Sequence, residues 1–170
     1  MTLEEQLLSE LRVAFGKVER RPDAELFAER RDYLWSEGLH GGSGPWWEVS
    51  DEAIAHEPHA LDELKIAGYQ FFLPAYLSWV IKNLHTDFFT ADSTIYSLDA
   101  SACGEPASSE RRSRYGSLSA AQRAAVVRFL TWAANHDDQL DADAASRALT
   151  TYWLSDNVTP NKSLERTRDE

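Results

Sequence analysis

The stretch GYQFFLPAYLSWVIKNL, Gly68 to Leu84, is the most apolar part of this 170-residue chain, and it carries a proline at its centre. Sixteen residues separate Lys65 from Lys82 without a single charge. A helix that crosses a bilayer needs about 20 apolar residues, and this run is shorter and contains Gln70 and Pro74. The stretch therefore predicts the centre of a soluble core, with no membrane association.

Pro74 predicts the start of a helix, because proline is tolerated in a first helical turn, where its missing N–H has no partner. We expect this helix to run from Pro74 to about Leu84, preceded by an extended or turn segment that holds Phe71 and Phe72. Its apolar residues cover most of the circumference, which is typical of a buried central helix. They are Tyr76, Leu77, Trp79, Val80, Ile81 and Leu84.

Helical spacing of apolar residues predicts further helices on both sides of this core. Two of them begin with a capping-box pattern, Thr2 with Glu5 and Ser119 with Gln122. The pattern is poor from about 87 to 115, where we expect a long loop in which Thr94 to Leu98 forms either a short strand or a helical turn. The other predicted helices span 2–18, 24–37, 59–67, 120–136 and 142–154.

Together these patterns predict an all-α or mainly α fold. We expect a single compact domain of five to six helices over residues 1–156, followed by a flexible C-terminal tail, 157–170. The formal net charge is −11. A surface this acidic repels phosphate backbones, so nucleic acid is not an expected partner, whereas a basic protein is compatible with it. The one cysteine, Cys103, and the lack of a signal-peptide pattern predict a cytoplasmic protein.

The segment AHEPHALDE, which begins at Ala55, contains the candidate metal ligands His56 and His59. Their spacing differs from the zinc-protease pattern, which needs two histidines four residues apart on one helix. A metal site would need help from His85 or Asp87. The alternative is an exposed helix start, and no cofactor or catalytic residue is assigned.

Other polar clusters leave alternatives open. The segment HDDQLDAD holds Asp137, Asp138, Asp141 and Asp143, which suit either a divalent cation or a helix N-terminus. Cys103 is either a nucleophile or an incidental loop thiol. The interface candidates are the tryptophans of the glycine-rich loop, which alternatively cap the core, and three arginines able to bind an anion or an acidic partner. These residues are Trp46, Trp47, Arg111, Arg112 and Arg114.

Three functional interpretations follow from these residues. The first is a non-enzymatic helical protein that binds a protein partner or a second copy of itself, as an accessory or immunity-like factor. The second is a small metal-dependent enzyme that uses His56, His59 and His85 with nearby carboxylates. The third is a binder of small apolar ligands, with a cavity near Tyr76 and Trp79.

Four segments of the chain together resemble an uncharacterised bacterial family, a domain of unknown function with a Leu-Pro-Ala-Tyr-Leu core motif. The resemblance covers most of residues 3–154 and implies a small helical domain, with no known activity and no catalytic residues. The tail NKSLERTRDE is similar to C-terminal ends encoded at the recombination site of a mobile gene cassette, which suggests an integron passenger gene. The segments are LRVAFGKVERRP from Leu11, FFLPAYL from Phe71, YGSLSAAQRAAVVRFLTWAA from Tyr115 and ASRALTTYW from Ala145.

Overall fold

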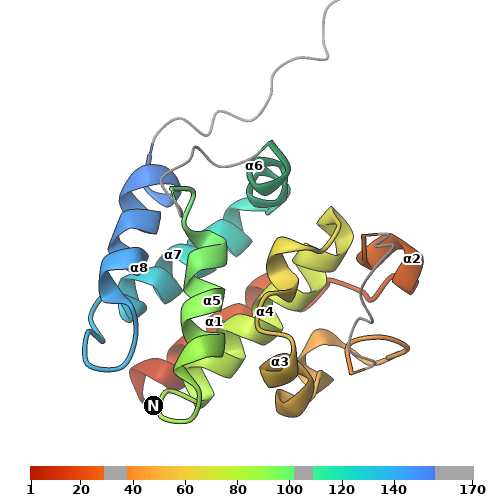
Figure 1. The fold of residues 1–170 in the computed structure, drawn as a ribbon, viewed down its shortest axis with the longest axis horizontal. Coiled ribbons are helices and arrows are strands. Elements are labelled where there is room, and N and C mark those ends of the chain that lie inside the picture. Colours follow the sequence, from red (N-terminus) through yellow and green to blue (C-terminus); the bar gives the residue numbers. More distant parts are fainter. Residues whose placement is uncertain (29–37, 102–108, 156–170) are drawn as a thin grey trace, which may run out of the picture.

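The computed structural model describes residues 1–28, 38–101 and 109–155, and within these ranges the chain forms eight α-helices and no strand (Figure 1). The fold is therefore mainly helical, as predicted, with more helices than the expected five to six. The elements are α1 (Leu3–Phe15), α2 (Asp23–Leu26), η1 (Trp46–Glu48), α3 (Asp51–His56), η2 (Ala60–Asp62), α4 (Ile66–Lys82), α5 (Phe88–Leu98), α6 (Ser109–Gly116), α7 (Ala120–Ala133), α8 (Ala142–Ala148) and η4 (Leu149–Trp153). Those labelled η are short 3₁₀ turns, except η4, which is a π-helical turn.

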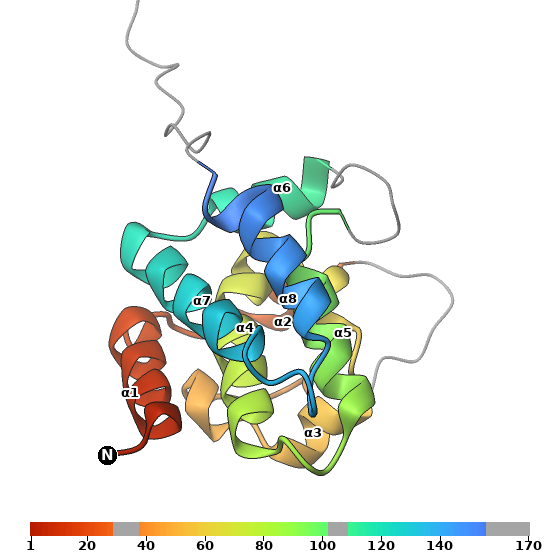
Figure 2. The ribbon, with the colours of Figure 1, turned by 90° about the vertical axis from the view of Figure 1, so that its left-hand side faces the viewer.

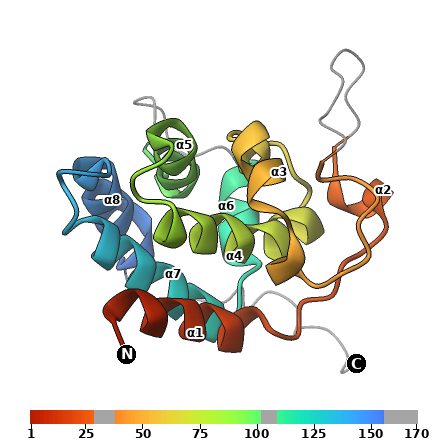
Figure 3. The same ribbon diagram turned by 90° about the horizontal axis from the view of Figure 1, so that it is seen from below.

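Helix α4 is the centre of the structure, and α1 lies on one side of it while α3 and α5 lie on the other (Figure 3). Thirteen of its 17 residues are buried, as expected for a helix that is apolar around most of its circumference. Helices α1, α7 and α8 lie side by side across one face of the molecule (Figure 2). No helix in the described ranges is long and apolar enough to cross a bilayer.

The predicted start of the central helix at Pro74 is wrong. The helix begins at Ile66, and Pro74 is buried inside it. Phe71 and Phe72, expected in an extended segment, are helical and fully buried. An internal proline costs about 3 kcal/mol, whereas burying each large apolar side chain contributes roughly 1.5–3 kcal/mol. Several such side chains precede Pro74, so burial outweighs the cost of the proline.

The predicted second and third helices also differ from the structure. Helix α2 ends at Leu26, and the rest of the predicted 24–37 helix falls in residues 29–37, outside the described part. Phe27 is extended and forms an antiparallel bridge with Leu64. That bridge splits the predicted 59–67 helix into η2 and the first turn of α4. The extended conformation is stabilised by ring contacts: the Phe27 ring stacks on His40 at 4.0 Å and packs on Phe72 at 5.7 Å between ring centroids.

The loop predicted from 87 to 115 is largely helical, since it contains α5 and α6. The α5 helix is hard to predict from sequence because four of its seven buried positions carry hydroxyl side chains, and only Ile95 and Leu98 are large and apolar. These hydroxyls are satisfied locally: Thr94 Oγ1 donates to the carbonyl of Thr90, and Ser97 Oγ donates to the carbonyl of Thr94. The Thr94–Leu98 segment is thus helical. Cys103 lies among residues 102–108, outside the described part, as does the predicted tail from 157 onward.

The flanking helices confirm the sequence patterns that predicted them. The Thr2 and Ser119 side chains each accept from the backbone of the third helical residue, and Glu5 and Gln122 return the bond, so both capping boxes are present. The last helix continues through η4, where Trp153 Nε1 donates to the carbonyl of Leu98 at 2.9 Å. This bond and the α5–α8 packing hold the C-terminal helices against the core.

A candidate ligand groove between α2 and α6

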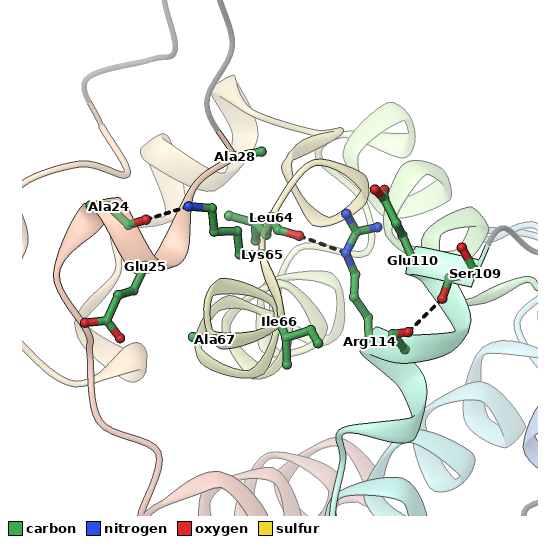
Figure 4. A pocket seen from close by; sticks show the side chains of 11 residues that line it. Ala24, Glu25, Ala28, Leu64, Lys65, Ile66, Ala67, Ser109, Glu110 and Arg114 are labelled. Carbon is green, nitrogen blue, oxygen red and sulfur yellow. Dashed lines mark hydrogen bonds between the residues drawn. The ribbon is translucent and has the colours of Figure 1, made fainter.

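A hollow of about 710 Å³ opens at the N-terminal end of α4, with α2 on one side and α6 on the other (Figure 4). We call it the α2–α6 groove. Its walls combine small or aliphatic side chains with a few charged ones, and its volume lies in the range of about 300–1,000 Å³ common for small-molecule sites. The lining residues used below are Ala24, Glu25, Lys65, Ile66, Ala67, Glu110 and Arg114.

Helix α6 is held firmly enough to fix the direction of Arg114. On one side of α6, the buried Tyr115 donates its hydroxyl to the carbonyl of Ser97 at 2.6 Å. On another, Arg111 donates to the Asp62 carboxylate at 2.7 Å and to the carbonyl of Asp99 at 3.1 Å. These bonds tie α6 to α5 and η2, and Arg114 consequently faces the start of α4.

Arg114 is a largely buried residue whose charge is paired with no carboxylate of the described residues. Its side chain is only 9% exposed, and Nε donates to the carbonyl of Leu64 at 2.8 Å (Figure 4). Within residues 1–28, 38–101 and 109–155, no carboxylate forms an ion pair with it, and neither Nη atom has a hydrogen-bond partner. The two Nη atoms are not fully buried, since they open onto the groove although the residue as a whole is nine-tenths buried. Its Nη edge is therefore available to an anion in the groove.

The N-terminus of α4 is the second electropositive feature. Its N-cap residue, Lys65, makes no side-chain capping bond, and its first turn contains no acidic residue. The first N–H groups of a helix have no partner within the helix, and together they carry about half a positive charge. Ile66 and Ala67, the first two helical residues, both line the groove, so this end of α4 lies beside it.

Of the four charged residues that line the groove, Arg114 is buried, and Glu25, Lys65 and Glu110 are exposed. Lys65 Nζ donates to the carbonyl of Ala24 at 2.8 Å, which ties α2 to the segment before α4. Two acidic and two basic side chains thus line the groove.

Tyr69 lies close to Arg114 and has an unused hydroxyl. The residue is buried, and its hydroxyl has no hydrogen-bond partner among residues 1–28, 38–101 and 109–155. Burial raises the pKa of Tyr69 well above its usual value, because the phenolate would lose its hydration; the nearby charges of Tyr115 and Asp62 act in the same direction, and Arg114 acts in the opposite one. Tyr69 therefore remains a neutral donor close to Arg114.

The predicted metal ligands have local structural roles. His56 Nδ1 lies 2.8 Å from the carbonyl of Glu52, and the His59 ring packs edge-on against Phe89 at 5.1 Å. His85 is in an exposed turn, and Asp87 caps α5 by accepting from the backbone N–H groups of Phe89 and Thr90. In the part of the chain that the structure describes, no three His, Cys, Asp or Glu side chains are grouped closely enough to hold a metal ion.

The predicted interface residues are separated in the structure. Trp46 is in the core and donates Nε1 to the carbonyl of Phe15 at 3.1 Å, whereas Trp47 is half-buried beneath the Arg12 guanidinium, 3.4 Å from its ring centroid. Of the three arginines, Arg111 holds α6, Arg112 is exposed, and Arg114 lines the groove.

The cavity expected near Tyr76 and Trp79 is replaced by packed core. The Tyr76 hydroxyl donates to the carbonyl of Glu57, and Trp79 Nε1 donates to that of Asp51 at 3.1 Å. The groove lies instead at the other end of α4. The one groove residue that the sequence singled out is Arg114, in the arginine cluster.

A second surface combines exposed aromatic and acidic side chains, and we call it the acidic–aromatic surface. Phe88 and Phe89, at the start of α5, are 54% and 61% exposed. Phe88 shares a shallow hollow of about 340 Å³ with Asp92, Asp137 and Asp138. Burial and the nearby charge of Asp141 raise the pKa of Asp92, although the backbone N–H of Asp141 partly opposes this. The hollow therefore concentrates negative charge beside an apolar side chain.

Asp141, in the acidic segment 136–143, caps α8, as one of the two alternatives predicted. It accepts from the backbone N–H of Ala144 at 2.8 Å and from the Tyr96 hydroxyl at 2.6 Å. The bond from Tyr96 holds the pKa of Asp141 below its usual value and raises that of Tyr96 to about 12. The connection between α5 and α8 is thereby fixed.

Fold and groove together define a small, mainly helical protein built around one buried helix, with an open amphipathic hollow at that helix's N-terminus. The chain belongs to the family of unknown function DUF6714, which it matches over residues 7–157. The resemblance to an uncharacterised family is thus confirmed, while its bacterial and integron origin stays a prediction. No curated protein and no solved structure matches the chain.

Proposed function

We propose that this protein is a non-enzymatic binding protein whose ligand occupies the α2–α6 groove. The observation that carries the proposal is the combination, in one hollow of about 710 Å³, of apolar walls with a largely buried arginine that forms no ion pair with any described residue. Binding sites of small molecules have this composition: mostly apolar surface, with a few polar groups that fix orientation.

The hydrogen bonds of the groove support binding rather than proton transfer. Lys65, Arg114 and Ser113 donate to the backbone carbonyls of Ala24, Leu64 and Ser109, respectively (Figure 4). A nucleophile with its general base would instead be joined side chain to side chain. These bonds hold the lining side chains in place, which lowers the entropy that a ligand must overcome.

Filling the groove is expected to abolish binding. Ala67→Trp places a large ring in the groove from the first turn of α4, and we expect it to weaken binding of hexan-1-ol, a neutral apolar probe, at least tenfold. Amide chemical shifts in an NMR titration measure this, and in the wild type the shifted signals should belong to groove residues such as Ile66 and Ala67. The matched control is Ala120→Trp, an exposed first-turn position of α7. Equal binding by all three proteins would contradict the proposal.

We propose as a second function that the acidic–aromatic surface docks a basic segment of a partner protein. Exposed neighbouring aromatic residues are favoured interface anchors, and the aspartates beside Phe88 complement a positive charge. This surface keeps the protein-partner interpretation of the sequence, at residues other than the predicted tryptophans and arginines.

The double variant Phe88→Ser/Phe89→Ser is expected to lose a basic partner in a pull-down from a lysate of the source organism. Asp137→Asn/Asp138→Asn should weaken the same capture, and more so in low salt, because screening already reduces the charge attraction at high salt. Leu3→Ser, which removes an exposed apolar residue of α1, is the control. Capture of the same proteins by every variant would exclude this surface as the docking site.

A further inference from the structure

We infer that the ligand of the α2–α6 groove carries a carboxylate on a short apolar body, with the carboxylate held between the Nη edge of Arg114 and the N-terminus of α4. The inference rests on the proposed function of the groove and names its ligand class. Two electropositive elements from different parts of the chain meet at this hollow, and each lacks its usual partner in the described residues.

The guanidinium geometry favours a planar anion. Because Nε is already bonded to the carbonyl of Leu64, the side chain is fixed and presents only its two Nη groups. Two parallel N–H groups match the two oxygens of a carboxylate, and such charge-assisted pairs are among the strongest hydrogen bonds in proteins. Arg114 is held in this position before a ligand arrives, so little rotamer entropy is lost on binding.

The α4 N-terminus adds backbone donors on the other side of the same hollow. In other helices of the fold, the side chain of the N-cap residue accepts hydrogen bonds from the free N–H groups of the first turn. Ser50 caps α3, Asp87 caps α5 and Asp141 caps α8 in this way. Helix α4 has 17 residues and no such cap. An anionic group there would serve as the missing cap, as anions do at other helix N-termini.

The acidic character of the whole chain favours a monoanion over a phosphate. Glu25 and Glu110 are exposed at the rim, and the chain as a whole carries a formal charge of −11. The two glutamates repel a doubly charged phosphate more than a carboxylate, but Lys65 and Arg114 attract it more in the same proportion, so it is the acidic body of the chain that disfavours a phosphate. The apolar body would lie against Ile66 and Ala67, which line the groove beside the helix end.

Two sources supply this chemistry, a free organic acid and the C-terminal residue of a peptide chain. Both present one carboxylate next to an apolar group. Hexanoate represents the first source, and an N-acetylated tripeptide that ends in leucine represents the second, with its amidated form as the neutral control.

The test compares hexanoate with hexan-1-ol on wild type, Arg114→Gln and Arg114→Lys by NMR titration. We expect wild type to bind hexanoate at least tenfold more tightly than hexan-1-ol. Arg114→Gln should raise the Kd for hexanoate roughly 10- to 100-fold, the range for loss of a charged hydrogen bond, and leave hexan-1-ol within about threefold. Arg114→Lys should have a Kd for hexanoate between those of wild type and Arg114→Gln, because lysine keeps the positive charge but lacks the two parallel N–H donors.

Glu110→Gln tests the preference for a carboxylate independently of whether the Arg114 variants fold. It removes an exposed like charge beside the groove, so hexanoate should bind a few-fold more tightly while hexan-1-ol is unaffected. Tighter binding of the free than the amidated peptide assigns a chain end as a ligand. Binding of hexanoate without binding of either peptide assigns a free acid.

The outcomes separate this inference from the function on which it rests. If hexanoate and hexan-1-ol bind equally, and Ala67→Trp blocks both, the groove is a binding site and the carboxylate inference is wrong. Hexyl phosphate binding more tightly than hexanoate would also overturn it. If neither probe binds in a manner that depends on Ala67, the proposed function fails as well.

Discussion

Leu77→Asp is expected to abolish soluble, folded protein. Leu77 lies in the middle of α4 and is fully buried, so its replacement removes apolar contacts and places a carboxylate where no partner is available. Loss of a buried leucine costs about 2–5 kcal/mol, and an unpaired buried charge adds several more. The total reaches the whole stability of a typical domain, about 5–15 kcal/mol.

Two further variants make this result interpretable. Leu77→Ala should remain folded and lose about 2–5 kcal/mol in the free energy of unfolding, measured by urea denaturation. Val13→Asp introduces the same charge at a position of α1 that is 81% exposed, and it should lower that free energy by at most about 1 kcal/mol, because the last turn of a helix disfavours a negative charge. Soluble Leu77→Asp with an unchanged melting temperature would contradict the placement of α4 at the centre.

Gly68→Ala is expected to destabilise the protein, although alanine is the better helix former by about 1 kcal/mol. Gly68 is in the first turns of α4, where the backbone of Leu26 crosses it closely. A Cβ atom at Gly68 would clash with the Leu26 carbonyl oxygen and lie 2.9 Å from its carbonyl carbon. Both atoms are backbone, so α2 would have to move.

We expect Gly68→Ala to lower the free energy of unfolding by roughly 1–3 kcal/mol, as other overpacking substitutions do, and to lower Tm by roughly 2–12 °C. Differential scanning calorimetry measures the change. Gly116→Ala, at the end of α6, is the matched control, because a Cβ there meets nothing within 4 Å. A melting temperature for Gly68→Ala equal to or above that of wild type would show that α2 does not approach α4 as closely as described.

Local patterns of the sequence were sufficient to predict α1, α7 and the last helix, because capping and periodicity act within a few residues. Pro74 was misleading because its local preference is opposed by non-local burial of the aromatic residues before it. The α5 helix was missed because its buried Thr and Ser residues do not resemble an apolar helix face. They can be buried because the α5 backbone carbonyls accept their hydroxyl hydrogen bonds. The Phe27–Leu64 bridge joins residues far apart in sequence, which no local pattern can reveal.

The groove was predictable only through one of its residues. Arg114 stood in a cluster with Arg111 and Arg112 as a possible anion-binding group, but only the fold shows that it is buried beside α4 and that Arg111 pairs with Asp62 instead. The lining comes from α2, the start of α4 and α6. Their assembly depends on tertiary packing, so neither Lys65 nor Ala67 was a candidate from sequence.

A crystal structure of the protein with hexanoate tests the central claim most directly. We predict electron density for the carboxylate within hydrogen-bond distance of the Arg114 Nη atoms and the first backbone N–H groups of α4, with the aliphatic chain against Ile66 and Ala67. Hexanoate bound elsewhere, or bound in the groove with its carboxylate directed away from Arg114, would contradict the account.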